Sequence, residues 1–101
     1  MARRYIREDL VLVYRANVRD ILYMLHLRHE DFAQMLGVTR QAVSTMLTRP
    51  DLRLTCVQYL ATLRALDECL MKLDEDTDPK AKVARMLWNK LNDEYLEKGL
   101  H

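Results

Sequence analysis

The sequence is poor in the residues that make tight turns, with two glycines and two prolines among 101 residues. An all-β sandwich or barrel needs a turn about every 8 to 12 residues, which this supply does not allow. We therefore predict an all-α domain. The chain also lacks an apolar run near the roughly 18 residues of a membrane span, and no apolar segment follows Arg3 and Arg4 as it would in a signal peptide. We expect no membrane partner and a cytoplasmic location.

Cysteine is scarce as well. Cys56 and Cys69 stand 13 residues apart and outside any CxxC spacing, which favours two half-buried thiols in a reducing compartment over a disulfide or zinc framework. His26 and His29 have no third ligand near them in sequence, so we predict no metal site and no cofactor. The sequence has no glycine-rich phosphate loop, paired carboxylates or nucleophile elbow. We expect no enzymatic activity.

The net charge of +1 hides an uneven distribution. Residues 1–50 carry eight arginines and five acidic residues, a balance of +3, whereas residues 51–101 carry eight basic and ten acidic residues, a balance of −2. Arginine presents a planar fork of donors that suits phosphate and guanine edges, although a solvated helical face would look similar. We expect the acidic stretch from Asp67 to Asp78 to point away from any nucleic acid.

Apolar residues at helical spacing predict a succession of helices. The first covers roughly residues 15–27, and two short helices follow at residues 30–36 and 40–48. The continuous apolar run at residues 10–14 fits two structures. It either extends the first helix from an Asp9 cap or forms a strand in a dimer seam, and we favour the helix.

Two further helices are predicted in the second half of the chain. One begins at Thr55, a natural N-cap, and runs to about Leu73. The other begins at an Asp78 cap with Pro79 in the first helical position. Gly99 is expected to end it, because glycine commonly stops a helix.

Residues 29–48 meet the local demands of two helices joined by a three-residue turn. The turn needs a residue in the left-handed conformation, which Gly37 adopts without steric cost. Close passage of the helices needs a small side chain, which is Ala33, and a branched apolar plug between them, which is Val43. The Thr39 hydroxyl can cap the second helix. This combination predicts a helix-turn-helix motif.

The second helix of this motif has one polar face without charge. Gln41, Ser44, Thr45 and Thr48 recur at the spacing of a single helical face. A face that only needs solvation, as in an ordinary bundle, more often carries Lys and Glu, whereas short amide and hydroxyl side chains suit base-pair edges in the major groove. Arg40, at the start of the helix, can reach guanine or a phosphate. We therefore predict that this helix reads double-stranded DNA.

About residues 15 to 67 resemble the DNA-binding domain of the Cro/cI-like (XRE) family of phage repressors, plasmid regulators and antitoxins. The matching stretches are Phe32-Ala33, Leu36-Gly37-Val38-Thr39-Arg40 and Val43-Ser44 in the motif, and Tyr59-Leu60-Ala61 and Arg64-Ala65-Leu66 after it. The resemblance implies a five-helix, lambda-repressor-like domain that binds operator DNA as a dimer and has no catalytic role. In this chain an extra C-terminal helix is expected to follow.

By matching positions, the resemblance also implies which residues contact DNA. The expected base readers are Arg40, Gln41 and Thr45, with Ser44 helping. The expected phosphate contacts are Arg28, His29, Thr39, Thr48, Arg49, Arg53 and Thr55. The family commonly has Gln where this chain has His29, but either side chain can donate to a phosphate oxygen. Amides at a helix N-terminus, here after Thr55, bind phosphate in any case.

Three segments are predicted: an N-terminal extension over residues 1–14, the helix-turn-helix domain over residues 15–73, and a C-terminal amphipathic segment over residues 74–101. The last segment contains an apolar stripe formed by Leu87, Trp88, Leu91 and Tyr95. The stripe either packs on its own domain or forms a two-fold seam with a second copy, and the amount of apolar surface favours the seam. Whether residues 1–14 or residues 79–98 supply the dimer interface stays open.

Together these features predict a homodimeric, sequence-specific DNA-binding regulator, of repressor type, that binds a palindromic operator in the nucleoid of a bacterium or on plasmid or phage DNA. One alternative is an antitoxin, which uses the same domain on DNA and keeps a surface for a protein partner, a toxin or an antirepressor. Another is a protein-interaction module that does not bind DNA, because a net charge of +1 makes the sequence-independent electrostatic attraction small.

Overall fold

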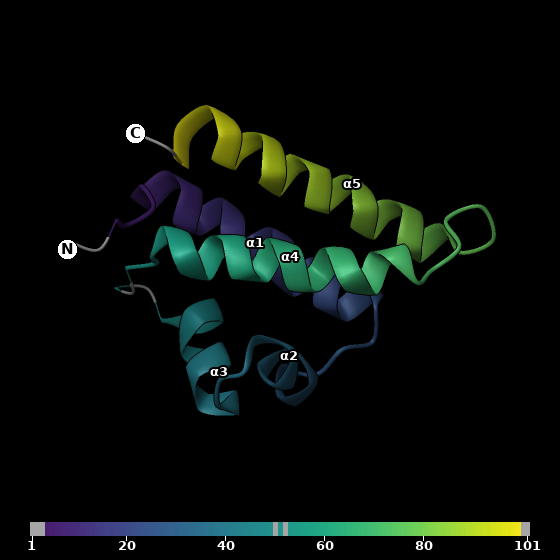
Figure 1. The fold of residues 1–101 in the computed structure, drawn as a ribbon, viewed down its shortest axis with the longest axis horizontal. Helices are drawn as coiled ribbons and strands as arrows, with labels where there is room; N and C mark the ends of the chain where they lie inside the picture. Colours follow the sequence, from purple (N-terminus) through teal and green to yellow (C-terminus); the bar gives the residue numbers. More distant parts are fainter. Residues whose placement is uncertain (1–3, 50, 52, 100–101) are drawn as a thin grey trace.

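The computed structural model describes residues 4–49, 51 and 53–99. Over these residues the chain forms five α-helices and one closing π-helical turn (Figure 1). Their bounds are α1 Glu8–Met24, α2 His29–Leu36, α3 Arg40–Thr48, α4 Cys56–Met71, α5 Pro79–Glu94 and η1 Tyr95–Gly99. The only pairing of β type within the described residues is an isolated antiparallel bridge between Tyr5 and Thr55. The all-α prediction is confirmed for this part of the chain.

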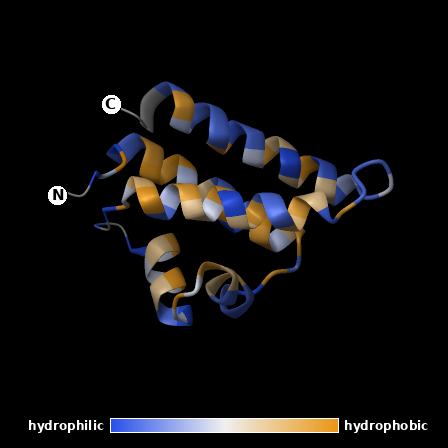
Figure 2. Cartoon of the chain, viewed as in Figure 1, coloured by the Kyte–Doolittle hydropathy of each residue, from blue (hydrophilic) through white to orange (hydrophobic). Residues whose placement is uncertain are grey.

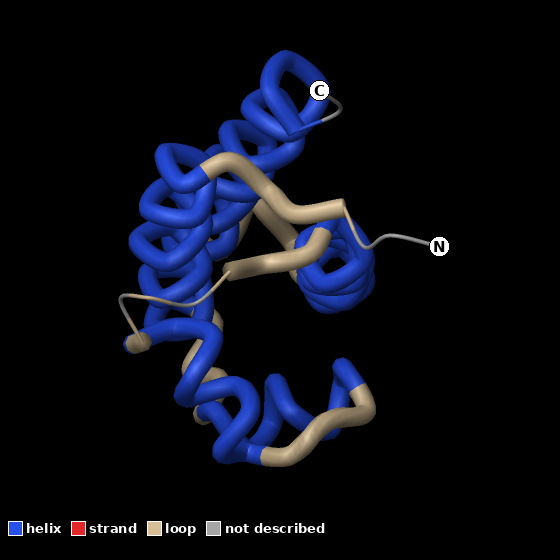
Figure 3. Tube along the Cα trace, turned by 90° about the vertical axis from the view of Figure 1, so that its left-hand side faces the viewer, coloured by secondary structure: helices blue, strands red, loops and turns tan. Residues whose placement is uncertain are grey.

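The helices form two groups. α5 packs along α1 and α4, whereas α2 packs on α3 and α4, and α3 packs on α1. Figures 1 and 3 show α2 and α3 together on one side of the molecule and α5 on the other. Hydrophobic residues recur along α1 and α4 between these two sides, and the α4–α5 loop is hydrophilic (Figure 2). None of the helices in the described ranges is of the length and apolar character that a membrane crossing needs.

α1 begins earlier than the predicted domain boundary. It starts at Glu8 and buries Leu10 and Tyr14 in the core, so the apolar run at residues 10–14 is helical and the strand alternative is wrong. The N-cap is Arg7 rather than Asp9. Because one helix crosses the predicted boundary between residues 14 and 15, residues 8–14 belong to the helical domain and not to a separate extension.

α1 also ends three residues before the predicted end at residue 27. Its last residue is Met24, and the backbone N–H of Leu25 still donates to the Ile21 carbonyl oxygen at 2.9 Å. His26 then adopts a φ of 56°, in the left-handed region, which turns the chain away from the helix axis towards α2. Apolar periodicity continued through this point because Leu25 and Leu27 still pack against the core.

The predicted caps of the later helices are confirmed. The Thr39 hydroxyl accepts from the Ala42 N–H, the Thr55 hydroxyl accepts from the Gln58 N–H, and the Asp78 carboxylate accepts from the Lys80 N–H. Pro79 occupies the first turn of α5, and η1 ends at Gly99. α4 ends at Met71, two residues before the predicted Leu73. The extra C-terminal helix expected after a five-helix domain is α5 itself, continued by η1.

The predicted dimer seam on α5 is corrected by the packing. Leu91 and Tyr95 are buried within their own chain, and Leu87 and Trp88 pack against the same core. The Trp88 Nε1–H donates to the Leu63 carbonyl oxygen at 2.8 Å. The stripe faces α1 and α4 because these helices offer it apolar surface within the chain. The described residues 74–99 therefore pack on the rest of the chain, and Leu91 and Tyr95 keep almost no exposed surface for a second copy.

The centre of the core holds two buried tyrosines that bind across helices. The Tyr14 hydroxyl lies 2.9 Å from the Thr62 hydroxyl, which itself donates to the Gln58 carbonyl oxygen at 2.9 Å. Since the Thr62 proton is already used, Tyr14 is the donor in the first pair. The Tyr59 hydroxyl donates to the Leu91 carbonyl oxygen at 2.8 Å. These bonds connect α1 to α4 and α4 to α5, and each buried hydroxyl is thereby satisfied.

We expect the Gly37→Ala variant to lower the free energy of unfolding by about 1–2 kcal/mol, because Gly37 has a φ of 70° and an L-residue is strained there. No heavy atom lies within 4 Å of a Cβ placed at this position, so the loss reflects backbone conformation and not a clash. Gly37→Asn is the matched control and should lose less, since asparagine tolerates the left-handed region better. Urea denaturation of the three proteins measures the effect. Equal losses for Ala and Asn would contradict the conformational explanation.

Candidate nucleic-acid interface

α2, the turn at residues 37–39 and α3 form the predicted helix-turn-helix arrangement. Gly37 caps α2 in the left-handed conformation. Ala33 and Val43, the small residue and the plug, are 3% and 0% exposed, and they lie where the two helices meet. Figure 1 shows α2 nearly end-on while α3 runs across the view, so the two axes cross steeply. Ala33 and Val43 are therefore buried, as the motif requires of the small residue and the plug, and Gly37 has the left-handed conformation that the turn requires.

The predicted base readers on the outer face of α3 differ in how exposed they are. Arg40 and Gln41 are exposed at the start of the helix, and Ser44 and Thr45 are half-buried. The Thr45 hydroxyl donates to the Gln41 carbonyl oxygen at 2.9 Å, and the exposed Thr48 hydroxyl donates to the Ser44 carbonyl oxygen. The two threonines therefore present an acceptor oxygen and a methyl group, whereas Arg40 presents donors and Gln41 presents both a donor and an acceptor.

One contact of this face was missed in the sequence. His29 Nδ1 lies 3.0 Å from the Ser44 hydroxyl oxygen, which connects the start of α2 to the middle of α3. A separation of 15 residues gives no periodic signal for such a pair; only the crossing of the two helices brings it together. When Nδ1 accepts from Ser44, the ring carries its proton on Nε2, which is a donor for a phosphate oxygen. The phosphate contact of His29 and the base contact of Ser44 therefore both stay predictions, and the Ser44 hydroxyl lies where it holds the His29 ring.

The N-terminal ends of α2 and α3 share a small hollow of about 290 Å³, lined by Arg28, His29, Glu30 and Arg40. The Arg28 guanidinium lies 3.5 Å from the Asp31 carboxylate. The backbone N–H of Arg28 also donates to Asp31 and is the main reason why the pKa of that carboxyl is lowered. Two arginines and two helix N-termini favour an anion here, and Glu30 and Asp31 reduce that attraction.

The loop after α3 carries two further predicted phosphate contacts. The Arg49 guanidinium forms an ion pair with Asp51 at 2.9 Å, and both side chains are exposed. Arg53 lies over the Tyr5 ring, with its guanidinium carbon 4.1 Å from the ring centre. Both arginines are accessible to a phosphate at the loop, but each already has a partner within the chain.

The phosphate contact predicted at Thr55 stays a prediction, and the groups that would make it already have partners within the chain. The Thr55 N–H and hydroxyl both donate to the Gln58 side-chain oxygen, at 2.9 and 3.1 Å. The next amide of α4, that of Cys56, donates to the Arg4 carbonyl oxygen at 2.9 Å. The capping box and the bridge to residues 4–6 thus bind the donors of Thr55 and Cys56 within the chain. Sequence reasoning recognised the cap, but not the N-terminal segment that lies against it.

The remaining surface leaves α3 accessible. The acidic α4–α5 loop lies at the end of the molecule away from α3, and α5 lies on the opposite side (Figures 1 and 2). The loop therefore points away from the candidate interface, as its charge predicts.

No protein-family model, curated protein or solved structure matches this chain. The resemblance to the Cro/cI-like family therefore depends on the residues of the motif and on their spacing.

Proposed function

We propose that this chain is a sequence-specific DNA-binding repressor of the Cro/cI-like type, which inserts α3 into the major groove of double-stranded DNA. The observation that carries the proposal is the face of α3. This outer face, opposite the buried Val43, Met46 and Leu47, presents uncharged hydrogen-bonding side chains. Arginines flank it at both ends.

The chemistry of that face fits base-pair edges. A glutamine amide makes two hydrogen bonds to the N6 and N7 edge of adenine, and an arginine fork does the same with the O6 and N7 edge of guanine. Gln41 and Arg40 are exposed where the N-terminal part of a recognition helix contacts bases. Thr45 and Thr48 offer methyl groups, which suit the thymine methyl, and acceptor oxygens, which suit an exocyclic amine.

Contacts with the DNA phosphates are expected to contribute only modestly to the binding affinity. Arg28, Arg40 and Arg49 flank α3, but Arg28 and Arg49 each lie against an aspartate. Each neutralised phosphate adds about 0.9 to the slope of log affinity against log salt. With few net positive charges at the interface, the affinity depends mainly on direct contacts with bases, so discrimination between sequences is expected to be high relative to total affinity.

The test is selection of binding sequences from a pool of random DNA duplexes, followed by affinity measurements on the selected duplex and on a scrambled one. We expect one sequence motif to be enriched and bound about 10³-fold or more tightly than the scrambled duplex. A palindrome with half-sites about 34 Å apart indicates two copies on one operator, joined by a surface other than the stripe of α5. Enrichment of no motif, with equal affinity for both duplexes, refutes DNA reading and leaves a protein-interaction module.

Arg28→Ala is expected to weaken binding to the selected and the scrambled duplex by the same factor. It should also reduce the salt slope by about one unit, because one phosphate contact is lost. The variant keeps the bond from the Arg28 backbone N–H to Asp31, so α2 retains its cap. Fluorescence anisotropy at several salt concentrations measures both effects. Lys90→Ala, an exposed change on α5, is the control and should leave the slope unchanged. A loss confined to the selected duplex would contradict the assignment of Arg28 to phosphate.

A further inference from the structure

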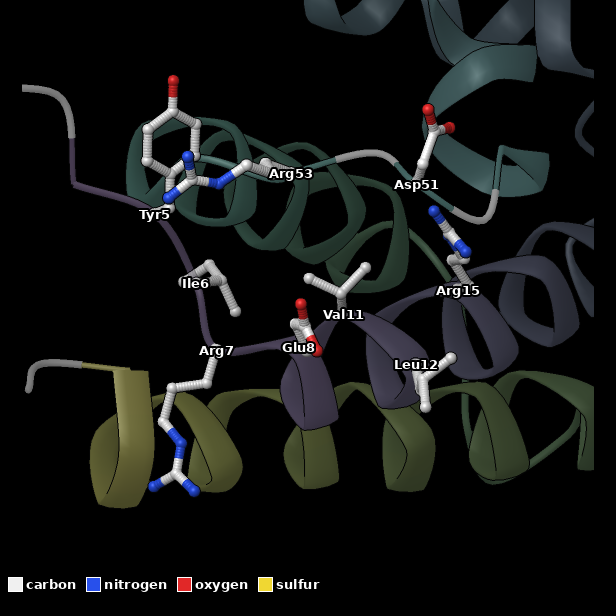
Figure 4. A pocket seen from close by; sticks show the side chains of 9 residues that line it. All are labelled: Tyr5, Ile6, Arg7, Glu8, Val11, Leu12, Arg15, Asp51 and Arg53. Atoms are coloured by element: carbon white, nitrogen blue, oxygen red, sulfur yellow. The ribbon is translucent and has the colours of Figure 1, made fainter.

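A second hollow, larger than the one beside α3, lies between the start of α1 and the loop that follows α3. Its volume is about 510 Å³, within the range of pockets that hold small organic molecules. Figure 4 shows side chains from both segments around it. Ile6, Val11 and Leu12 supply apolar surface. We call this space the α1 hollow.

Arg15 lines the α1 hollow and has an unusual environment. Its Nε and Nη2 atoms are buried and have no hydrogen-bond partner among the described residues. Buried side-chain donors are nearly always paired, and a guanidinium keeps its charge at any pH that a protein tolerates. Because solvent does not reach these two atoms in the free chain, a carboxylate pairs with them only when the Arg15 side chain turns towards the hollow. The guanidinium fork then offers it two parallel hydrogen bonds. Arg15 is therefore the group in this hollow that most needs an anionic partner.

The opposite end of the α1 hollow is formed by Arg53 and Tyr5 (Figure 4). The Arg53 guanidinium lies over the Tyr5 ring at 4.1 Å, an arrangement that holds its plane and its charge in one place. A ligand with a flat apolar or aromatic body fits between this pair and Val11. Its charged group would then lie next to Arg15.

Acidic groups also line the α1 hollow, and they define its balance. Asp51 is held by Arg49 at 2.9 Å, and Glu8 is exposed at the first turn of α1. Arg7, the third arginine of the lining, lies 3.4 Å from Asp9. Three arginines face two carboxylates, and one of these carboxylates already has a partner. The hollow therefore favours a single negative charge.

We propose that the α1 hollow binds a small organic anion that has a flat apolar body and one carboxylate, with Arg15 holding the carboxylate and Ile6, Val11 and Leu12 contacting the body. Nothing in the proposed DNA contact of α3 requires this site. The binding test contains no DNA, so its result does not depend on the proposed function.

The experiment is an NMR titration of the ¹⁵N-labelled full chain with 2-naphthoate, in parallel with its uncharged analogue 2-naphthamide. We expect saturable shifts of the amides of Ile6 to Leu12 and of the Arg15 Nε–H signal, with a dissociation constant of about 1 mM or lower for naphthoate. Naphthamide should bind at least about tenfold more weakly, because it lacks the charge that the arginine fork pairs with.

Two variants of Arg15 separate its charge from its shape. Arg15→Met should weaken naphthoate about tenfold or more and leave naphthamide unchanged, whereas Arg15→Lys, which keeps the charge but not the fork, should lose less. Arg19→Met, an exposed change one turn along α1, is the matched control and should bind as the parent chain does. The Lys variant alone carries the test where the Met variant does not fold. Equal affinity for the acid and the amide, shifts confined to other surfaces, or parental affinity in both Arg15 variants would overturn the proposal.

Discussion

Gln41→Ala is expected to weaken binding to the selected DNA sequence about 5- to 150-fold, a loss of about 1–3 kcal/mol. The Gln41 amide is exposed on the outer face of α3, where it can pair with both the donor and the acceptor of an adenine edge. Removing the amide leaves those base groups without partners in a contact that excludes water, which costs more than the loss of one bond in solution. Fluorescence anisotropy on the selected duplex, and on duplexes changed at one base pair, measures the effect.

The single-base duplexes decide what kind of contact Gln41 makes. A base reader loses discrimination at one base pair, so the variant should bind the parent sequence and one substituted sequence equally well. Gln34→Ala makes the same chemical change on an exposed position of α2 and should keep both affinity and discrimination. If Gln41→Ala weakens the scrambled duplex as much as the selected one, the side chain does not read a base, and the recognition face of α3 is wrongly assigned.

The α2–α3 region was predictable because its requirements are local. The left-handed residue Gly37, the cap Thr39 and the plug Val43 act within a few residues of one another, and α3 has the predicted bounds of Arg40–Thr48. Alternation of polar and apolar residues along a helix also fixes which side is exposed. The outward face of α3 follows from these facts without knowledge of any distant contact.

Contacts between segments that are distant in sequence could not be predicted in this way. The bond between His29 and Ser44 depends on how two helices cross. The donors of Thr55 are used by Gln58, beside a bridge to the N-terminal segment. Periodicity identified the stripe of α5 but not the surface that covers it, and α1 and α4 cover it in this chain. An apolar stripe specifies that something must pack on it, and only the whole fold specifies what.

The free energy of unfolding should decrease by about 2 kcal/mol more between pH 9 and pH 11.5 in the parent chain than in the Tyr14→Phe variant. Burial raises the pKa of Tyr14 to about 12. In the unfolded chain a tyrosine loses its proton near pH 10. Between pH 10 and pH 12 the unfolded state has therefore released a proton that the folded state keeps. Rising pH favours unfolding across this window, and no such effect exists below it.

Urea denaturation at the two pH values measures this difference. Tyr14→Phe also loses the hydrogen bond to Thr62, so at pH 9 it should be about 1 kcal/mol less stable than the parent. Its free energy of unfolding should nevertheless fall less between pH 9 and pH 11.5. Tyr23→Phe is the control, because Tyr23 is 79% exposed and should leave the decrease unchanged. Burial also raises the pKa of Tyr59, so part of the decrease should persist in Tyr14→Phe and diminish again in the double variant with Tyr59→Phe. If the free energy of unfolding of Tyr14→Phe falls as steeply with pH as that of the parent, the Tyr14 hydroxyl is hydrated in the folded chain. Its position in the closed contact between α1 and α4 is then wrong.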